Sequence, residues 1–129
     1  GTIRLIHEEK APIIRSDGTY IRDYVYVKDV VDAVLTIAQH IQSKKLGGEA
    51  FNISTKNKKS VLEIVERILR LMESNLKPVI LNQAKGEIKN QYLSTEKLEQ
   101  KLGWVSHYSL DEGLTETIQW YENHFKKNS

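Results

Sequence analysis

Apolar positions recur at helical spacing in two long segments of the chain. From Asp29 onward, valine and isoleucine recur at steps of three and four residues, which places their side chains on one face of a helix. These apolar positions are Val30, Val34, Ile37 and Ile41. Asp29 is available as an N-cap, so we expect a helix from Asp29 to about Gln42.

A second and wider apolar stripe follows Ser60. Ser60 and Glu63 have the spacing of a capping box, in which each side chain accepts a hydrogen bond from the backbone N–H of the other residue. The stripe behind this cap is wide enough to face a core. It consists of Val61, Ile64, Val65, Ile68, Leu69 and Met72. The sequence therefore predicts a buried helix that begins near Ser60.

Three further segments have helical signals. Ser109 and Glu112 repeat the capping box. The helix that they predict has an apolar side formed by Leu114, Ile118, Tyr121 and Phe125. A shorter helix is expected from about Thr95 to Leu102, closed by Gly103, because glycine readily adopts the left-handed conformation that ends a helix. Residues Thr2 to Glu9 are compatible with a helix or the tail of one.

Short runs of β-branched and aromatic residues lie between the predicted helices and are bounded by turn-forming residues. We expect strands in these runs, which are Pro12 to Arg15, Tyr24 to Val27, Glu49 to Ile53 and Pro78 to Leu81. Asp17-Gly18 predicts a tight turn that joins two of them. The predicted fold class is α/β, a small mixed α/β domain over residues 1–129. Its strands are too few for a full doubly wound sheet, which indicates a small domain that belongs to a larger protein.

The composition excludes several classes of protein. The 129 residues are 40% hydrophobic and carry a net charge of +2, so charge alone indicates neither a nucleic-acid nor a membrane partner. Cysteine is absent, which excludes disulfides and thiolate metal sites. Residues Gly1 to Lys10 lack the basic start and apolar run of a signal peptide. We therefore expect a globular cytoplasmic protein.

Motifs for catalysis or cofactor binding are missing from the sequence. There is no glycine-rich phosphate loop, no His-Glu-x-x-His, no Gly-x-Ser-x-Gly, and the four histidines are too widely spaced for a metal site. Tyr24 and Lys28 have the Tyr-x-x-x-Lys spacing of a dehydrogenase acid/base pair, which requires a helix to bring the side chains about 6 Å apart. Residues 25–27 predict an extended run, which separates the pair by about 13 Å. We therefore assign no catalytic role to this pair.

Arg22 is the first of several polar residues suited to an anionic ligand. It follows the Asp17-Gly18 turn, and a guanidinium binds a diphosphate through two parallel hydrogen bonds. The alternative is that Arg22 pairs with Asp23 or Asp29. Spacing alone does not decide between these two interpretations.

Two other elements supply polar groups. Asn52 lies at the end of a predicted strand, where side chains of an α/β fold commonly face the ligand crevice. Residues 85–92 form a polar loop, and Gly86 gives its backbone conformational freedom. Lys89 and Gln91 could therefore reach one side of the anion that Arg22 would bind. The alternatives are that Asn52 stabilises a turn and that the loop is merely solvated.

Four stretches of the chain, in the same order, resemble the substrate-handling part of the extended short-chain dehydrogenases, the NAD-dependent epimerase/dehydratase family. They are RSDGTYIRDYVYVKD at 15–29, GEAFNIS at 48–54, KGEIKNQYLS at 85–94 and KLGWVSHYSLDEGLTETIQWY at 101–121. The resemblance covers nearly the whole chain. Tyr20 and the GEIKNQYLS stretch resemble the CDP-glucose 4,6-dehydratase subgroup most closely.

The resemblance implies substrate-binding roles at a set of positions in this chain. They are Pro12, Ile13, Ile14, Arg22, Asn52, Lys89 and Gln91. Arg22 and Lys89 would hold the diphosphate, although relatives often have arginine at the lysine position. Asn52 and Gln91 would make polar contacts to the nucleotide, and the first three residues would line the base pocket. We therefore expect Arg22, Asn52 and Lys89 to converge around one two-phosphate group.

The resemblance also implies the activity of an intact enzyme. NAD, bound mainly by an N-terminal Rossmann domain that this chain lacks, would take a hydride from sugar C4. Water would leave across C5 and C6, and the hydride would return to C6. Residues 1–129 alone would then be the C-terminal nucleotide-sugar-binding domain, inactive and without NAD. The intact enzyme would be a homodimer.

Three other functions remain as alternatives. A nucleotide-sugar 4-epimerase or reductase would share this substrate domain and differ chiefly in the missing half. A non-catalytic nucleotide-sugar binding module would need a complete crevice within this chain. A nucleic-acid-binding module is suggested by Lys44, Lys45, Lys56, Lys58 and Lys59, but the acidic residues elsewhere in the chain argue against it.

Overall fold

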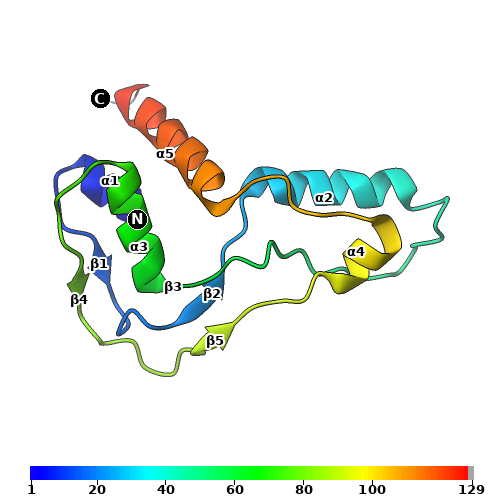
Figure 1. Ribbon diagram of the computed structural model, residues 1–129, viewed down its shortest axis with the longest axis horizontal. Helices are drawn as coiled ribbons and strands as arrows, with labels where there is room; N and C mark the ends of the chain where they lie inside the picture. The colour runs from blue at the N-terminus through cyan, green and yellow to red at the C-terminus, as the bar shows by residue number, and fades with distance from the viewer. Residues whose placement is uncertain (128–129) are drawn as a thin grey trace.

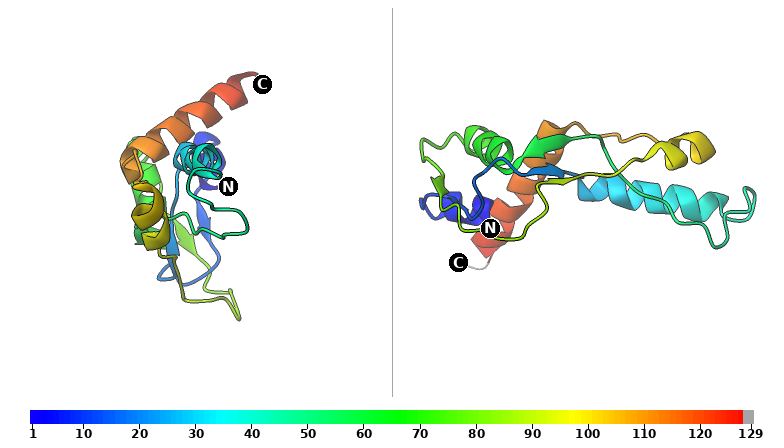
Figure 2. Two further views of the ribbon diagram at one scale, coloured as in Figure 1. Left: turned by 90° about the vertical axis from the view of Figure 1, so that its right-hand side faces the viewer. Right: turned by 90° about the horizontal axis from the view of Figure 1, so that it is seen from below.

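The computed structural model describes residues 1–127 and has an elongated mixed α/β arrangement (Figure 1). Its helices are α1 (Thr2–His7), α2 (Val27–His40), α3 (Val61–Leu71), α4 (Glu96–Leu102) and α5 (Leu110–Lys127). Its strands are β1 (Ile13–Ile14), β2 (Ile21–Asp23), β3 (Lys58–Ser60), β4 (Val79–Ile80) and β5 (Asn90–Gln91). In the right-hand view of Figure 2, α2 and α4 extend as an arm from the end that contains α1 and α3. None of the helices in residues 1–127 is long and apolar enough to cross a membrane.

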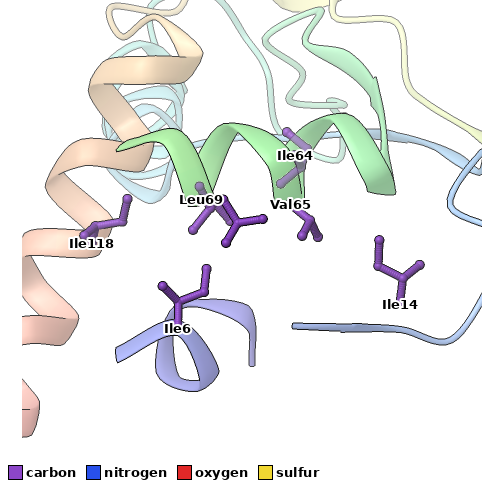
Figure 3. Packing of buried hydrophobic residues seen from close by; sticks show 7 residues of the cluster. Ile6, Ile14, Ile64, Val65, Leu69 and Ile118 are labelled. Carbon is purple, nitrogen blue, oxygen red and sulfur yellow. The ribbon is translucent and has the colours of Figure 1, made fainter. Parts of the chain in front are cut away.

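The main core lies between α1, β1, α3 and α5 (Figure 3). Its buried residues are Ile6, Ile14, Ile64, Val65, Ile68, Leu69 and Ile118. Helix α3 supplies most of them, and its predicted capping box is confirmed. The Ser60 hydroxyl accepts a hydrogen bond from the Glu63 N–H at 3.1 Å, and Glu63 Oε2 accepts one from the Ser60 N–H at 2.7 Å. Each buried aliphatic side chain of this size contributes about 1.5–3 kcal/mol.

A second, smaller core joins α2 to α4 in the arm. Its buried residues are Ala33, Leu98 and Trp104, and Ile37, Phe51, Ile53 and Leu102 pack against them. The indole Nε1–H of Trp104 donates a hydrogen bond to Asp32 Oδ2 at 2.8 Å. Because this contact satisfies the only polar atom of the indole, the ring is buried without an unpaired donor.

The strands form two separate small sheets. In the first, β1 pairs with β4 in parallel, with Ile13 opposite Val79 and Ile14 opposite Ile80. In the second, the strand order is β3-β2-β5, with β2 antiparallel to β3 and parallel to β5. The Asp17-Gly18 turn therefore links two sheets and does not close a hairpin. Gly18 has a φ of 87°, which a glycine adopts without strain.

Several helix ends agree with the sequence prediction. Helix α4 ends at Gly103, which has a left-handed φ of 65°. The second capping box also forms, with Ser109 Oγ accepting from the Glu112 N–H at 3.2 Å and Glu112 Oε2 accepting from the Ser109 N–H at 2.8 Å. The segment Thr2–His7 is helical, as the sequence allowed. These features depend on residues only a few positions apart.

The start of α2 differs from the prediction. Val27 begins the helix, and the N-cap is Tyr26, without a side-chain hydrogen bond. Asp29 lies within the first turn and is 0% exposed. Its Oδ1 accepts a hydrogen bond from the His107 N–H at 2.8 Å, so it ties a distant loop to α2 and does not cap the helix.

Two predicted strands are also wrong. Residues 24–26 have no regular structure, and the strand begins three residues earlier, at Ile21–Asp23. The run Glu49 to Ile53 is outside any sheet of the described residues. Conversely, β3 and β5 were not predicted, because Lys58–Ser60 and Asn90–Gln91 are polar and short.

The contact between Gly113 and Tyr26 offers a test of this packing. A Cβ atom at position 113 would lie 2.9 Å from both Cβ and Cγ of Tyr26. We expect Gly113→Ala to lower the free energy of unfolding by about 1–3 kcal/mol, although alanine favours a helix, because the added methyl overpacks the site. Urea denaturation measures this change. Gly47→Ala is the control, since nothing lies within 4 Å of a Cβ there, and an equal loss in both variants would contradict the explanation.

Candidate functional site

The three-stranded sheet places Arg22 between two polar residues. Arg22 is paired with Lys59 of β3 on one side and with Gln91 of β5 on the other. Directly opposed residues on neighbouring strands project to the same face of a sheet. The sheet therefore presents a row of Lys59, Arg22 and Gln91, which we call the polar row.

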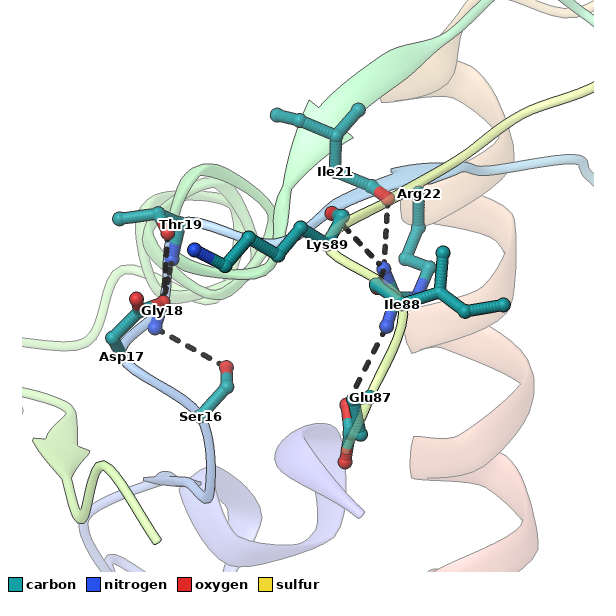
Figure 4. A network of polar contacts seen from close by, with 9 residues as sticks. All are labelled: Ser16, Asp17, Gly18, Thr19, Ile21, Arg22, Glu87, Ile88 and Lys89. Atoms are coloured by element: carbon teal, nitrogen blue, oxygen red, sulfur yellow. Dashed lines mark hydrogen bonds and ion pairs between the residues drawn. The ribbon is translucent and has the colours of Figure 1, made fainter. Parts of the chain in front are cut away.

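The guanidinium of Arg22 is held by the segment that leads into β5 (Figure 4). Its Nη1 donates to the carbonyl oxygens of Ile21 at 2.9 Å and Ile88 at 2.8 Å. Its Nη2 lies 3.4 Å from Glu87 Oε2, and the Arg22 side chain is 25% exposed. The guanidinium also lies 5.7 Å from the ring centre of Tyr20. These contacts fix its position and leave part of it open to a ligand.

The structure corrects the alternative for Arg22. The sequence allowed an ion pair with Asp23 or Asp29, but the carboxylate beside Arg22 belongs to Glu87. Asp29 instead accepts from the His107 backbone, and one oxygen of Asp23 accepts weakly from the Leu93 N–H at 3.4 Å. Spacing along the chain could not identify Glu87, because the two residues meet only when β5 pairs with β2.

Lys89 is next to Arg22 in space but its side chain points another way. Figure 4 shows the lysine side chain extending toward the turn at Asp17, Gly18 and Thr19. In that turn, Asp17 Oδ1 accepts from the N–H and from the hydroxyl of Thr19, each at 2.8 Å. These two hydrogen bonds, with a smaller contribution from the charge of Lys89, lower the pKa of Asp17. The site therefore has a second positive group beside a carboxylate that stays ionised.

Asn52 contacts a different part of the molecule, the N-cap of α4. Its carbonyl oxygen accepts a hydrogen bond from the Thr95 hydroxyl at 3.4 Å, just before α4. No contact in the described part of the chain joins Asn52 to Arg22 or Lys89. The structure thus brings together Arg22, Gln91 and the backbone of Lys89, whereas Asn52 is not among them.

The run Pro12 to Ile14 divides between the core and the surface. Pro12 and Ile14 are fully buried, and Ile14 belongs to the main core. Ile13 is 53% exposed. Of these three residues, only Ile13 has a side chain exposed at the surface.

Lys59 is a member of the polar row that the sequence had named only for a nucleic-acid site and not for the diphosphate. Its Nζ lies 3.3 Å from Glu63 Oε1, and its side chain is 38% exposed. Lys59 belongs to a strand with no apolar alternation, so no sequence pattern indicated β3. Its position directly before the capping box at Ser60 was the one available signal, because a helix start fixes the preceding residue in an extended conformation.

Tyr24 and Lys28 lie in different surroundings. Tyr24 precedes α2, Lys28 lies in the first turn of the helix, and burial raises the pKa of Tyr24. A catalytic tyrosine of this type needs the opposite shift. Lys28 instead pairs with Glu116 of α5, and the Tyr26 hydroxyl donates to the same Glu116 Oε2 at 2.7 Å.

Metal binding has no support in the described residues. Residues 1–127 contain no group of three or more histidine, cysteine, aspartate or glutamate side chains placed to hold a metal ion. A cavity of about 210 Å³ lies between the start of α2 and α5 and is lined largely by Tyr24, Tyr26, Tyr108 and Leu114. Its lining also includes Asn57, so the cavity begins directly beyond the ends of β2 and β3, whose side chains Arg22 and Lys59 belong to the polar row.

The chain is a mixed α/β unit in which Arg22 and Lys59 occupy directly opposed positions on neighbouring strands. Comparison with known proteins identifies the family of this chain. The family model described as GDP-mannose 4,6 dehydratase matches residues 2–117. The UDP-glucuronate 4-epimerase of Thermodesulfobacterium geofontis is 35% identical over 119 residues, 92% of this chain. The chain therefore belongs to the nucleotide-sugar epimerase and dehydratase family of NAD-dependent enzymes, the extended short-chain dehydrogenases.

Solved structures agree with this assignment. The UDP-glucose 4-epimerase of Thermotoga maritima, solved with UDP-glucose, matches 96% of this chain with a TM-score of 0.83 and 29% identity. The dTDP-glucose 4,6-dehydratase of Bacillus anthracis, solved with NAD, matches 95% of this chain with a TM-score of 0.78 and 28% identity. These matches confirm the predicted fold class.

The chain spans only part of these relatives. It covers 35% of the Thermodesulfobacterium epimerase and 30% of the UDP-glucose 4-epimerase of Cyamopsis tetragonoloba, which is 31% identical to it over 105 residues. It covers 38% of the Thermotoga chain and 37% of the Bacillus chain. About two thirds of each relative therefore has no counterpart in these 129 residues.

The contact of Glu116 with Lys28 and Tyr26 should make stability depend on pH. Lys28, and then Tyr26, lower the pKa of Glu116 below its ordinary value of 4.5. Stability from this carboxylate is therefore fully present above pH 4.5 and is lost as the pH falls toward the lowered pKa. We expect Glu116→Gln to flatten the pH dependence of the urea midpoint in this acid range.

Glu122→Gln is the matched control for that measurement. Glu122 lies on the same helix and makes no ion pair within the described residues. It should leave the acid dependence of the urea midpoint as in the wild type. An acid dependence that survives in Glu116→Gln would show that other carboxylates cause it.

Proposed function

We propose that this chain is the nucleotide-sugar-binding portion of an NAD-dependent 4,6-dehydratase that acts on CDP-glucose, in the synthesis of sugar nucleotides for cell-surface polysaccharides. The polar row carries the proposal, because Arg22 lies directly opposite Lys59 on one neighbouring strand and Gln91 on the other. A nucleoside diphosphate offers two adjacent phosphates to such a row. The GEIKNQYLS stretch is the basis for the choice of subgroup.

Glu87 marks the place that a phosphate would take. Its carboxylate is 3.4 Å from Arg22 Nη2, and its side chain is 51% exposed. An ion pair this long and this exposed contributes about 0–1 kcal/mol. A phosphate oxygen could therefore replace the carboxylate at little cost, while the carbonyl oxygens of Ile21 and Ile88 keep the guanidinium in place.

The other predicted substrate contacts remain part of the proposal. Lys89 would approach the second phosphate after its side chain turns from Asp17, and Ile13 would pack against the base. Asn52 would reach the nucleotide only if the intact enzyme brings the arm over the polar row. Their assignment rests on the resemblance, and the polar row supports only the diphosphate contacts.

The residues of this chain would position the substrate, and the remainder of the enzyme would supply the redox chemistry. This sequence has no glycine-rich dinucleotide loop, so none of its residues is assigned to NAD. In the intact enzyme NAD would accept a hydride from the sugar and return it. Binding energy from the base and the phosphates would hold the sugar in place for that step. We propose that the intact enzyme is a homodimer.

A nucleotide-sugar 4-epimerase is the second candidate. It is favoured by the curated relatives that this chain resembles, among them the 35% identical UDP-glucuronate 4-epimerase. Both activities would use the same phosphate contacts, so the polar row does not distinguish them. The reaction product does.

Incubation of the intact enzyme and NAD with CDP-glucose, UDP-glucose and UDP-glucuronate tests the choice. We expect CDP-glucose to be consumed fastest and its product to be lighter by one water in mass spectrometry. A product of unchanged mass with inverted configuration at C4 would reject the dehydratase in favour of the epimerase.

Loss of Arg22 should weaken substrate binding. In the intact enzyme we expect Arg22→Ala to cost about 2 kcal/mol or more in nucleotide-sugar binding, because a charged group of the ligand is left without its partner. Arg22→Lys should recover part of this loss, since it keeps the charge and removes the fork. Isothermal titration calorimetry measures both variants.

Arg70→Ala is the matched control for this titration. Arg70 is an exposed arginine of α3 that makes no ion pair in residues 1–127. It should leave the affinity unchanged. An affinity that Arg22→Ala does not alter would remove Arg22 from the substrate site.

A further inference from the structure

The cavity of about 210 Å³ between α2 and α5 has a single charged residue in its lining, within the part of the chain that the structure describes. This residue is Asp29, in the first turn of α2, which lies near the first turn of α5 (Figure 1). The rest of the lining is neutral and includes Tyr24, Tyr26 and Tyr108. The polar row contributes no residue to it, so the cavity is separate from the proposed diphosphate contacts.

The carboxylate of Asp29 is buried, and only one of its oxygens is hydrogen-bonded. The residue is 0% exposed, and its Oδ1 accepts from the His107 N–H at 2.8 Å. Its Oδ2 is buried and makes no hydrogen bond within residues 1–127. A buried acceptor without a donor costs free energy, and a buried negative charge without a partner costs more. An occupant of the cavity that is positive and carries a donor would remove both costs.

Lys28 precedes Asp29 in the sequence but does not neutralise it. Its Nζ pairs with Glu116 of α5, and the lysine lines a neighbouring cavity of about 390 Å³ and not the one that contains Asp29. Among residues 1–127, Asp29 takes part in no ion pair. The negative charge of Asp29 therefore faces the cavity without a cation from this chain.

Two of the tyrosine rings that line the cavity stand edge to face. The ring centres of Tyr26 and Tyr108 are 4.9 Å apart, and the rings are inclined at 70°. The face of an aromatic ring is partly negative and attracts cations. Lys28 already shows this attraction, because its Nζ lies 5.9 Å and 5.8 Å from the two ring centres. A second cation, inside the cavity, would contact the same pair of rings with Asp29 beside it.

The volume of the cavity restricts the occupant to a compact group. A protein cavity of about 150 Å³ takes up a ligand of the size of benzene, so this cavity has room for a small branched amine and not for a nucleotide. Leu110 and Leu114 supply an aliphatic part of the wall, which suits alkyl groups. The lining thus combines one negative oxygen, aromatic rings and aliphatic side chains.

We propose that this cavity binds a small alkylammonium ion. The N–H of the ion donates to Asp29 Oδ2, its charge compensates the carboxylate, and its alkyl groups contact the tyrosine rings and the leucines. A neutral alcohol fits the same volume and also supplies a donor, but it leaves the charge of Asp29 uncompensated. A metal ion needs several oxygen ligands, and residues 1–127 contain no group of three or more acidic, histidine or cysteine side chains placed to hold one.

Trimethylammonium chloride is the probe, and the methyl signals of Val25, Leu110 and Leu114 in NMR spectra of the intact enzyme report its binding. These signals should shift and saturate with a Kd of about 1–10 mM, which is typical of a ligand with so few non-hydrogen atoms. tert-Butanol has the same shape and a donor but no charge, and it should bind about tenfold more weakly. Sodium chloride keeps the ionic strength constant. Equal affinity for the two probes, or no shift at about 100 mM trimethylammonium, would overturn the proposal.

Asp29→Asn tests the carboxylate itself. Asparagine keeps the volume and still accepts from the His107 N–H, but it removes the charge. We expect the affinity for trimethylammonium to fall about tenfold and that for tert-butanol to stay the same. Asp32→Asn is the matched control, because Asp32 lies one turn further along α2, accepts from Trp104 and does not line the cavity. Wild-type affinity in Asp29→Asn, or an equal loss in Asp32→Asn, would contradict the assigned role of Asp29.

Tyr108→Leu is a second variant that answers the question even where Asp29→Asn does not fold. Leucine keeps an apolar wall and removes one ring face, so the affinity for trimethylammonium should fall about fivefold while that for tert-butanol changes little. Far-UV circular dichroism checks that each variant is folded. Unchanged trimethylammonium affinity in folded Tyr108→Leu, or an equal loss for both probes, would show that the cavity does not recognise a cation and would overturn the proposal.

Discussion

The pairing of β2 on both of its edges is the constraint on which the candidate site depends. This short strand joins β3 and β5, which lie far from it and from each other along the chain. A shift of one residue in either pairing would move Arg22 to the face opposite its neighbours. The hydrogen bonds from Arg22 to the Ile88 carbonyl and its contact with Glu87 help to hold the parallel partner in register. The same side chain thus stabilises the sheet and presents a positive group.

Arg22 makes two kinds of polar contact, one with backbone carbonyl oxygens and one with an exposed carboxylate. The guanidinium is fixed by neutral carbonyl oxygens, whereas its acidic neighbour Glu87 is exposed and more distant. Exposed pairs contribute little to stability, so exchange of this carboxylate for another anion changes the energy of the fold only slightly. Asp17 differs, because hydrogen bonds from Thr19 lower its pKa and keep it charged beside Lys89. The site is therefore positive at Arg22 and balanced at the adjacent turn.

The two cores of the molecule differ in how completely the surrounding elements enclose them. The main core is enclosed by α1, α3 and α5, and its residues are buried. The second core, in the arm, has Ala33, Leu98 and Trp104 as its buried residues, and several larger apolar side chains of α2 are exposed. The relatives compared above are about three times longer than this chain.

The sequence by itself determined the features that arise between near neighbours. The capping box at Ser60, the left-handed Gly103 and the apolar stripe of α3 each depend on residues within a turn or two, so local spacing was sufficient to predict them. Only the tertiary structure decided which strands form and which polar residues meet. A strand needs a partner from elsewhere in the chain, so Lys58–Ser60 pairs despite its polar sequence, while Glu49 to Ile53 remains unpaired despite its β propensity.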